Sequence, residues 1–175
     1  FAVVRIRSRV GSLILALMIA GLMIPVNAAV IPLFVLASDL GLLNTRIGVI
    51  IPAIAFNLPF AMLLISAWMQ NIPDELFDSG KVDGASFIQL FISLAVPLSI
   101  PIFGAIAIIT FVNIWNEFIL SLVILSGPDM RTVPLATSIF RGVYNTNRGY
   151  ISAGVLITII PVIIFYLLFH KSILS

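Results

Sequence analysis

Apolar residues fill this chain in long, nearly unbroken runs, and the polar residues are collected between them. The runs cover approximately residues 12–37, 47–69, 88–125 and 150–169. Each reaches the roughly 20 residues that a helix needs to cross the hydrocarbon core of a bilayer. A membrane-spanning strand would instead alternate apolar and polar residues over about 10 positions, and these runs do not alternate. The pattern therefore predicts an all-α, polytopic bundle of transmembrane helices.

The third run, residues 88–125, is too long for one straight span. We expect it either to tilt or to continue as a second structure after Asn113. Prolines also lie in or beside the runs, and membrane helices tolerate proline where neighbouring groups satisfy the freed carbonyls. These prolines are Pro25, Pro32, Pro52, Pro59, Pro97, Pro101 and Pro161. The spans are therefore expected to have points at which they can break.

Composition places the chain in a membrane rather than in water. Of its 175 residues, 61% are hydrophobic and 9% are charged, whereas a soluble domain has roughly 45–50% apolar and about 25% charged residues. We interpret residues 1–175 as a single multi-pass transmembrane domain. The arginines of "FAVVRIRSRV" place the N-terminal end in the cytoplasm by the positive-inside rule. Residues 70–88 would then also be cytoplasmic and residues 126–149 extracytoplasmic, although lysine and arginine are almost balanced between the two sides.

Several kinds of chemistry are excluded by the residue types present. The chain has no cysteine and a single histidine, His170, which excludes disulfides, thiolate nucleophiles and clustered imidazole metal sites. A net charge of +2 without a basic stripe argues against a nucleic-acid partner. No Gly-x-x-x-x-Gly-Lys-Ser/Thr loop is present to bind nucleotide phosphates. We therefore predict no catalytic residue, cofactor or metal site, and any use of ATP would require a partner.

A polar segment, residues 73–87, separates the second and third apolar runs. Pro73 suits the start of a helix, because its missing N–H is not needed there. Asp74 and Glu75 follow in the first turn, where carboxylates face the positive end of the helix dipole. Gly84 can supply a left-handed backbone bend before the apolar pattern resumes. We expect a short helix, a sharp bend and re-entry into the membrane, although an Asp-Gly pair by itself is also a common turn signal.

The spacing in and after this segment resembles the signature of permeases of binding-protein-dependent ABC importers, in their sugar-importing, maltose-type branch. That signature reads Glu-Ala-Ala, three residues, Gly, nine residues, then Ile-x-Leu-Pro. The matching positions here are Asp78-Ser79-Gly80, then Gly84, then Leu94-Ala95-Val96-Pro97. Asp83-Gly84-Ala85 also matches the Asp-Gly-Ala usual in the sugar-importing branch. Asp in place of Glu, and Ser-Gly in place of Ala-Ala, are departures that leave room for altered or weaker coupling.

The resemblance extends almost from end to end. The stretch "LPFAMLLISAWMQNIPDEL" is similar to the helix that precedes the motif in this family, and "FVNIWNEF" is similar to its Trp-Asn-Glu-Phe pattern. The chain corresponds to the C-terminal four of the family's usual six spans, so we expect a fragment. Its ending, "FHKSILS", departs from the family's Gly-rich, Lys-containing tail. The resemblance implies the ABC importer permease fold in the inner membrane of a bacterial or archaeal cell.

The resemblance also implies a mechanism. Such permeases form homo- or heterodimers, seat their cytoplasmic segment on an ABC ATPase subunit dimer and receive solute from an extracytoplasmic solute-binding protein. Closure of the ATPase on ATP would move the lipid-embedded spans by alternating access. The solute would be a sugar or oligosaccharide, or alternatively a non-sugar solute such as glycerol phosphate. The small residues of the motif would allow close approach of the partner. The residues expected to carry coupling are Asp78, Ser79, Gly80, Asp83, Gly84, Ala85 and Pro97.

Polar residues inside the apolar runs are candidates for a solute path, because burying them in lipid is costly. They are Asn27, Asn57, Asn113, Asn116 and Glu117. Amide and carboxylate groups can bracket sugar hydroxyls while the ring of Trp115 stacks on the sugar. The alternative is structural: the tryptophan would anchor at the membrane interface, and the asparagines would join neighbouring helices.

The 126–149 segment carries three arginines, and a loop of this length is usually functional or disordered. It could face the binding protein or simply cap the outer mouth. Two other classes of protein remain as alternatives. An intramembrane enzyme would need paired acids, or a nucleophile with a base, at membrane depth. A proton- or ion-coupled secondary carrier would need buried acids, and Glu117 comes close to this requirement. Neither class explains the spacing of residues 78–97.

Overall fold

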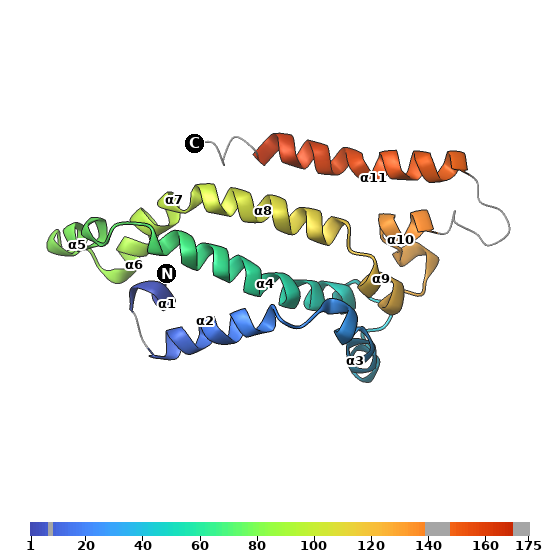
Figure 1. The fold of residues 1–175 in the computed structure, drawn as a ribbon, viewed down its shortest axis with the longest axis horizontal. Helices are drawn as coiled ribbons and strands as arrows, with labels where there is room; N and C mark the ends of the chain where they lie inside the picture. Colours follow the sequence, from blue (N-terminus) through green and yellow to red (C-terminus); the bar gives the residue numbers. More distant parts are fainter. Residues whose placement is uncertain (7–8, 139–147, 170–175) are drawn as a thin grey trace. The chain divides into compact units, whose positions relative to one another are not determined.

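The structure is a computed structural model that describes residues 1–6, 9–138 and 148–169, and every regular element within these residues is a helix (Figure 1). The predicted all-α fold class is confirmed. In chain order the elements are α1 (Ala2–Arg5), α2 (Arg9–Gly21), α3 (Val26–Asp39), α4 (Arg46–Gln70), α5 (Asp74–Val82), α6 (Phe87–Leu90), the π-helical turn η1 (Phe91–Ala95), α7 (Val96–Leu98), α8 (Ile100–Trp115), α9 (Ile119–Ile124), the 3₁₀ turn η2 (Pro128–Met130), α10 (Val133–Ser138) and α11 (Arg148–Phe169).

The chain divides into two compact units. Unit 1 contains Phe1–Met23 and Leu58–Ala107 together with Phe169. It therefore includes α1, α2, the C-terminal part of α4, and the elements from α5 to the first half of α8. Unit 2 contains Ile24–Asn57 and Ile108–Leu168. It includes α3, α9, η2, α10 and all of α11 except Phe169, with the remaining parts of α4 and α8.

Two of the described helices are long and apolar enough to cross a membrane by themselves: α4, and residues Ile151–Phe169 of α11. Two pairs of shorter helices also meet this criterion if each pair counts as one span, namely α2 with α3, and Phe87–Leu98 with α8. A short break separates the members of each pair. The described residues therefore contain between two and four candidate membrane spans.

The first apolar run, residues 12–37, is divided between two helices. α2 ends at Gly21, and α3 begins at Val26 after Pro25, which occupies the N-cap position in an extended conformation (φ −70°, ψ 134°). Proline disfavours the helical conformation of the residue before it and has no N–H with which to continue a helix. Run length alone indicated enough apolar residues for a span and did not locate this interruption.

The third apolar run is interrupted too, first at a place nearer its start than the change of structure expected after Asn113. Residues Phe91–Ala95 form the π-helical turn, and a break at Ser99 turns the chain by 63° before α8. The break lies between Pro97 and Pro101, and prolines and π-turns are the usual causes of such kinks. After Trp115 the chain leaves α8 and resumes as α9. The expected second structure near the end of this run therefore exists.

The core of unit 1 lies where α4 ends and the polar segment begins. Met69, Phe77, Leu90 and Ala95 are each at most 4% exposed and pack as one cluster. These residues come from α4, α5, α6 and η1 respectively. The polar segment is therefore not a detached surface loop, because α5 buries an aromatic side chain in the core of its unit.

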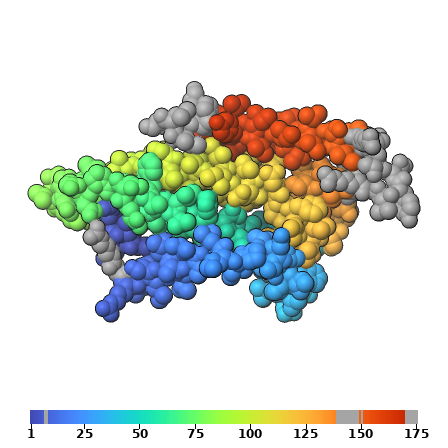
Figure 2. Space-filling model, in the orientation of Figure 1, coloured from blue at the N-terminus to red at the C-terminus, as the bar shows by residue number. Residues whose placement is uncertain are grey.

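Unit 2 has a smaller core and a long apolar surface. Ile124 and Leu125 pack with Leu135 of α10. In Figure 2, α11 (red) presents an extended surface, and its residues Leu156 and Leu168 are more than 60% exposed. A soluble monomer rarely leaves apolar surface of this extent in water. The exposed side of α11 is therefore suited to contact lipid or other membrane helices.

Candidate functional site

The helix α5 begins as its sequence predicts. Pro73 is at the N-cap position in an extended conformation (φ −55°, ψ 137°), and Asp74 and Glu75 lie in the first turn. Lys81 lies in the last turn, where a cation suits the negative end of the helix dipole. The charges at both ends therefore favour a helix over these residues.

The same helix ends in a Schellman motif. The N–H of Ala85 donates to the carbonyl of Gly80 at 2.9 Å, and the N–H of Gly84 donates to the carbonyl of Lys81 at 3.0 Å. Gly84 has a φ of +81°, so the predicted left-handed bend is confirmed. A Cβ added at Gly84 would have no atom within 4 Å. The backbone conformation, and not a lack of space within the chain, therefore favours glycine here.

Gly80 allows a close approach within the chain itself, in addition to the approach of a partner that the sequence predicts. A Cβ at this position would lie 2.5 Å from Cδ2 of Leu90 in α6. Gly80 therefore faces the chain's own core, near Phe77, which is 3% exposed. This glycine therefore allows α5 and α6 to approach each other closely, and its contact with a partner stays a prediction.

The exposed side chains of α5 carry the charges of the motif. Asp78 pairs with Lys81 at 2.7 Å, and their side chains are 64% and 63% exposed. The hydroxyl of Ser79 donates to the carbonyl of Leu76 in the same helix at 3.0 Å, and Asp83 is exposed at the helix end. An exposed ion pair of this kind contributes about 0–1 kcal/mol to stability. The two carboxylates are thus presented to solvent on a helix that is packed on its other side.

Pro97, the last residue of the motif, is exposed in the first turn of α7. Just beyond it, Ser99 is buried, and its hydroxyl lies 3.3 Å from the sulfur of Met69. The indole N–H of Trp68 donates to the carbonyl of Leu98 at 2.9 Å. The last turns of α4 are therefore bonded to the interruption that follows the motif, a contact that sequence reasoning did not predict.

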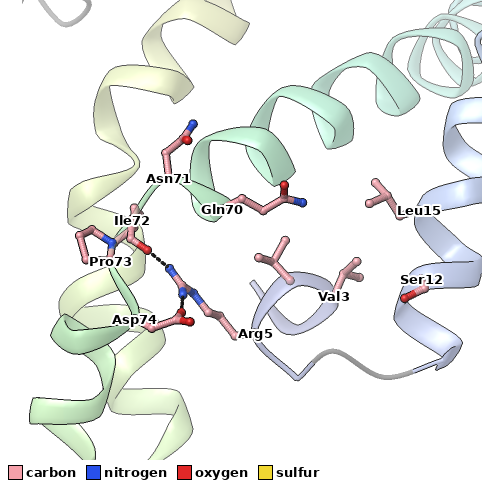
Figure 3. A pocket seen from close by; sticks show the side chains of 10 residues that line it. Val3, Arg5, Ser12, Leu15, Gln70, Asn71, Ile72, Pro73 and Asp74 are labelled. Atoms are coloured by element: carbon pink, nitrogen blue, oxygen red, sulfur yellow. Dashed lines mark hydrogen bonds and ion pairs between the residues drawn. The ribbon is translucent and has the colours of Figure 1, made fainter.

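Arg5 joins this site from α1, and sequence reasoning missed it too. Its Nη2 donates to the carbonyl of Met69 at 2.9 Å. The same nitrogen donates to the carbonyl of Ile72 at 2.7 Å, and Nη1 donates to the carboxylate of Asp74 (Figure 3). The guanidinium also lies 4.1 Å from the centroid of the Phe77 ring. In the sequence Arg5 served only as a signal of membrane orientation. No local pattern connects it with partners 64 to 69 positions away.

A pocket of about 520 Å³ lies beside Arg5. It is lined by residues of α1 and α2 and by the connection between α4 and α5, including Ser12, Leu15 and Gln70 (Figure 3). The guanidinium is turned towards Ile72 and Asp74, as the dashed lines of Figure 3 show. Its charge is therefore directed at the junction of the two helices.

The asparagines of the predicted solute path bond to their own helices. The side-chain amide of Asn57 donates to the carbonyl of Ala53 at 2.8 Å, and that of Asn116 donates to the carbonyl of Val112 at 2.9 Å. Asn113 is exposed. Bonds to a carbonyl four residues back satisfy part of an amide within one helix, and they do not join neighbouring helices.

Trp115 connects α8 with α11 in unit 2. Its indole N–H donates to the carbonyl of Thr158 at 2.9 Å. Its ring stacks on Phe111 with 5.7 Å between centroids, and Phe111 in turn stacks on Phe165 at 4.0 Å. The indole therefore bonds to α11 through its N–H, and one face of its ring stacks on a phenylalanine of α8 that itself stacks on α11.

Glu117 caps helix α9. One carboxylate oxygen accepts the N–H of Leu120 at 2.5 Å, and the other accepts the N–H of Ser121 at 3.0 Å and its hydroxyl at 2.8 Å. The first N–H groups of a helix have no partner within the helix, and a negative charge near them is favourable. Both oxygens of Glu117 are therefore in use within the chain.

Two of the predicted solute-path residues line different pockets. Asn116 lines a pocket of about 390 Å³ with residues of α10 and α11. Glu117 lines a different pocket of about 370 Å³, which also contains Arg46 and Arg131. Asn57 and Trp115 line neither of these two pockets. Adjacent residues of the sequence are thus separated between two pockets.

A second polar connection, in unit 2, was also missed by sequence reasoning. The side-chain oxygen of Asn44 accepts the N–H of Gly127 at 2.8 Å and that of Ser126 at 3.2 Å, and the N–H of Asn44 donates to the carbonyl of Ile124 at 2.8 Å. Asn44 has a φ of +55°, a conformation that asparagine adopts more readily than most residues. The turn before α4 is therefore joined to the segment that follows α9.

The described part of the 126–149 segment ends at Ser138 and contains η2 and α10. Arg131 is exposed there. Residues 139–147 and His170 lie outside the described residues. Within the part of the chain that is described, no group of three or more His, Cys, Asp or Glu side chains could hold a metal ion.

Comparison with known proteins connects these features with a family. The sequence profile described as "Binding-protein-dependent transport system inner membrane component" matches residues 1–172. The chain is 33% identical over 163 residues to the diacetylchitobiose uptake system permease protein NgcG of Streptomyces coelicolor. The aligned region is 92% of this chain and 54% of that protein. It is 36% identical over 155 residues to the trehalose transport system permease protein SugB of Mycobacterium tuberculosis, covering 87% and 57% respectively.

A third relative is the sulfoquinovosyl glycerol transport system permease protein SmoH of Agrobacterium fabrum. It is 31% identical over 175 residues, which is 100% of this chain and 61% of that protein. The chain thus spans between 54% and 61% of the length of these three relatives. The resemblance noted from the polar segment is confirmed, and the profile match over residues 1–172 shows that this chain belongs to the family of inner membrane components of binding-protein-dependent transport systems.

Proposed function

We propose that this chain acts within the transmembrane permease subunit of an ATP-driven, binding-protein-dependent importer for a sugar or oligosaccharide. Family membership supports the proposal. The names of two of the relatives support the class of solute, since NgcG is named for diacetylchitobiose and SugB for trehalose. The proposed partners are an ABC ATPase subunit dimer, a second permease subunit and an extracytoplasmic solute-binding protein.

The observation that carries the proposal is the construction of α5. Phe77 and Gly80 hold this helix against the core of unit 1, the bend at Gly84 ends it, and Asp78 and Asp83 remain exposed. A short, well-packed helix with exposed carboxylates is suited to dock in a basic cleft, where charge complementarity fixes the register of the two proteins. In this proposal α5 is cytoplasmic and conveys closure of the ATPase to the spans by alternating access.

Exposed apolar residues would contribute to the same interface. Val82 at the end of α5 is 87% exposed, and Ile88 in α6 is 68% exposed. Protein interfaces combine a buried apolar centre with a polar rim. An ATPase subunit that received Asp78 and Asp83 would therefore also remove these side chains from water.

The alternatives draw less support from the contacts. A proton- or ion-coupled secondary carrier would rely on Glu117, and both oxygens of that residue cap α9. An anionic solute such as glycerol phosphate would favour a positively charged path. Arg46 and Arg131 line one pocket, but Glu117 and Asp129 line it as well, so the opposite charges balance. A neutral solute fits this balance better than an anion does.

Reconstitution of the full-length permease tests the proposal. Co-purification should recover a second permease and two ATPase copies, and uptake into proteoliposomes should require ATP and the loaded binding protein. Calorimetry on that binding protein, with neutral oligosaccharides compared with glycerol phosphate, then identifies the class of solute. A stable permease that transports solute on an ion gradient without an ATPase would contradict the proposal.

The proposed orientation has its own test, because the chain contains no native cysteine. Single cysteines at Ser79 and Ser138 can be treated with a membrane-impermeant thiol reagent in intact cells. We expect labelling at position 138 and none at position 79. The reverse pattern would invert the orientation of α5 and exclude its contact with a cytoplasmic ATPase.

A further inference from the structure

We propose that Arg5 is a positioning residue for coupling: it fastens α5 to the end of α4, so that a displacement of α5 moves α4 with it. The consequence for transport rests on the proposed function. The fastening itself is a property of this chain and can be measured without a partner. We refer to Arg5 with its three partners, the carbonyls of Met69 and Ile72 and the carboxylate of Asp74, as the Arg5 clasp.

The guanidinium of the clasp bridges both sides of a short connection. Met69 lies in the last turn of α4, Ile72 lies in the connection, and Asp74 is the first residue of α5. All three bond to the one guanidinium. The Arg5 side chain is 12% exposed, compared with 56% for Asp74. A largely buried cation therefore joins two helices that are linked covalently by residues 71–73.

The geometry of the clasp suits arginine in particular. The two terminal nitrogens form a planar fork, so one can bond the carboxylate of Asp74 while the other bonds two carbonyls. The guanidinium also covers the ring of Phe77, and a cation over an aromatic face is attracted to it. Carbonyls at the end of α4 carry the negative end of the helix dipole, so the end of α4 and the carboxylate of Asp74 both favour a positive charge here. Lysine would keep the charge but has neither the fork nor the flat face.

A second, apolar contact holds α1 in the same place. The ring of Phe1 lies 4.7 Å from Phe87, 5.4 Å from Phe91 and 5.8 Å from Phe77, between centroids. These rings come from α6, η1 and α5 respectively. Two contacts of different chemistry therefore place α1 against the polar segment, and the position of Arg5 does not depend on its ion pair alone.

The mechanical consequence follows from the connection between the helices. Hinges form at a few loop or helix-end residues that absorb changes in backbone angle, and residues 71–73 are such a place. If the clasp is absent, α5 can move with an ATPase while α4 stays behind, and ATP is then hydrolysed without transport. The buried contact between Phe77 and Met69 remains. Loss of the clasp should therefore loosen the junction without detaching α5.

Spin labels can measure the fastening on the full-length permease in nanodiscs. Cysteines at Ala67 in α4 and Ser79 in α5 are both at exposed positions, and pulsed electron resonance gives the distance distribution between them. Arg5→Ala should broaden this distribution, and Arg5→Lys should broaden it less. Arg9→Ala removes an exposed arginine at the start of α2 and should leave the distribution unchanged. A distribution in Arg5→Ala as narrow as in the unmodified protein would overturn the proposal.

Coupling is measured as solute taken up per ATP hydrolysed in the reconstituted complex. Arg5→Ala should lower this ratio by between about twofold and thirtyfold, the range expected when a residue touches neither ligand but modulates the coupling between sites. The complex should still assemble, and Arg5→Lys should recover part of the ratio. A purely structural defect would lower solute uptake and ATP hydrolysis in proportion, so that the uptake per ATP stays unchanged. An unchanged uptake per ATP in Arg5→Ala would therefore overturn the coupling role of Arg5.

Two further outcomes are distinguishable. If Arg5→Ala fails to fold, Asp74→Asn keeps the guanidinium and its carbonyl bonds, and the same two measurements on that variant should show a smaller change in the same direction. No change in either measurement would overturn the proposal. If the unmodified complex neither binds an ATPase nor hydrolyses ATP, the proposed function fails, and the spin-label distances still decide whether the clasp fastens α5.

Discussion

Arg5 in unit 1 and Asn44 in unit 2 each join segments that are far apart in the sequence, and each does so through backbone groups near the end of a helix. Arg5 donates to carbonyls 64 and 67 positions away, whereas Asn44 accepts from amides 82 and 83 positions away. Arg5 is charged and its side chain is 12% exposed. Asn44 is neutral and exposed.

The difference in charge and exposure determines which polar groups lose a hydrogen-bond partner when each side chain is removed. Without Arg5, two carbonyls and the carboxylate of Asp74 lose a partner, and the ring of Phe77 loses its cover. Without the Asn44 side chain, two amides in an exposed turn can bond to water. Because water replaces a lost partner more readily at an exposed site than at a buried one, the Arg5 junction should be the more sensitive of the two. It is also the junction beside the helix that carries the family motif.

The largest loss of stability is expected for Arg5→Ala. We expect about 2–3 kcal/mol, the lower end of the range for removing one member of a buried charged pair, because Asp74 is already half exposed. Arg9→Ala should change the stability by less than about 0.5 kcal/mol, as surface substitutions usually do. Unfolding of the full-length permease in detergent measures both. Equal losses in the two variants would show that burial does not distinguish these arginines.

A somewhat smaller loss is expected for Gly84→Val at the other end of α5. Gly84 and Asn44 both have positive φ, and a β-branched residue held in that conformation costs about 1–3 kcal/mol. The altered bend should abolish uptake and uncouple ATP hydrolysis from it, while membrane insertion and the binding protein's affinity for solute stay unchanged.

Gly84→Asn is the matched control, since asparagine tolerates the left-handed conformation. A recovery of uptake in Gly84→Asn would assign the role of Gly84 to the backbone. If this variant is as inactive as Gly84→Val, the glycine instead provides space for a partner, because no atom of the chain itself lies within 4 Å of the added Cβ.

The features that could be predicted depend on neighbours in the sequence. The start of α5 at Pro73, its acidic first turn and the bend at Gly84 follow from helix capping, the helix dipole and backbone sterics, which act over a few residues. Arg5 and Asn44 could not be predicted in this way. Their partners are backbone N–H and C=O groups, which almost every residue carries. The sequence therefore does not indicate which distant backbone group each side chain will bond.

For the polar residues within the apolar runs, the sequence does not show whether each side chain bonds to solute or to the chain itself. Trp115 and Glu117 are candidates for a solute path, and within the chain the indole bonds to the carbonyl of Thr158 and the carboxylate caps α9. A polar group in a membrane needs a partner because an unsatisfied one is costly there. The chain's own backbone meets this need as well as a solute does. The solute path therefore stays a prediction, whereas these bonds give both residues a role within the fold.

Substitutions at Asn44 should lower the stability moderately. Two variants separate the contribution of the side-chain acceptor from that of the positive φ. Asn44→Ala loses the side-chain acceptor and also strains the backbone, whereas Asn44→Gly loses only the acceptor. We therefore expect Asn44→Ala to be less stable than Asn44→Gly by about 1 kcal/mol, and Asn44→Asp, which keeps an acceptor, to stay close to the unmodified protein. Unfolding in detergent measures all three. A loss for Asn44→Ala as large as that for Arg5→Ala would remove the distinction between the two junctions.

The smallest effect on stability is expected at Asp78, where the effect on transport should nevertheless be large. Asp78 and Lys81 are both mostly exposed, so Lys81→Ala and Asp78→Lys should each change the unfolding free energy by at most about 1 kcal/mol. If Asp78 docks in a basic cleft, Asp78→Lys places like charges together and should abolish uptake and ATPase binding. Lys81→Ala leaves the carboxylate in place and should retain both activities. Complex recovery and uptake measured for the two variants therefore separate an interface role from a structural one. Normal uptake in Asp78→Lys would show that α5 conveys no force through this carboxylate.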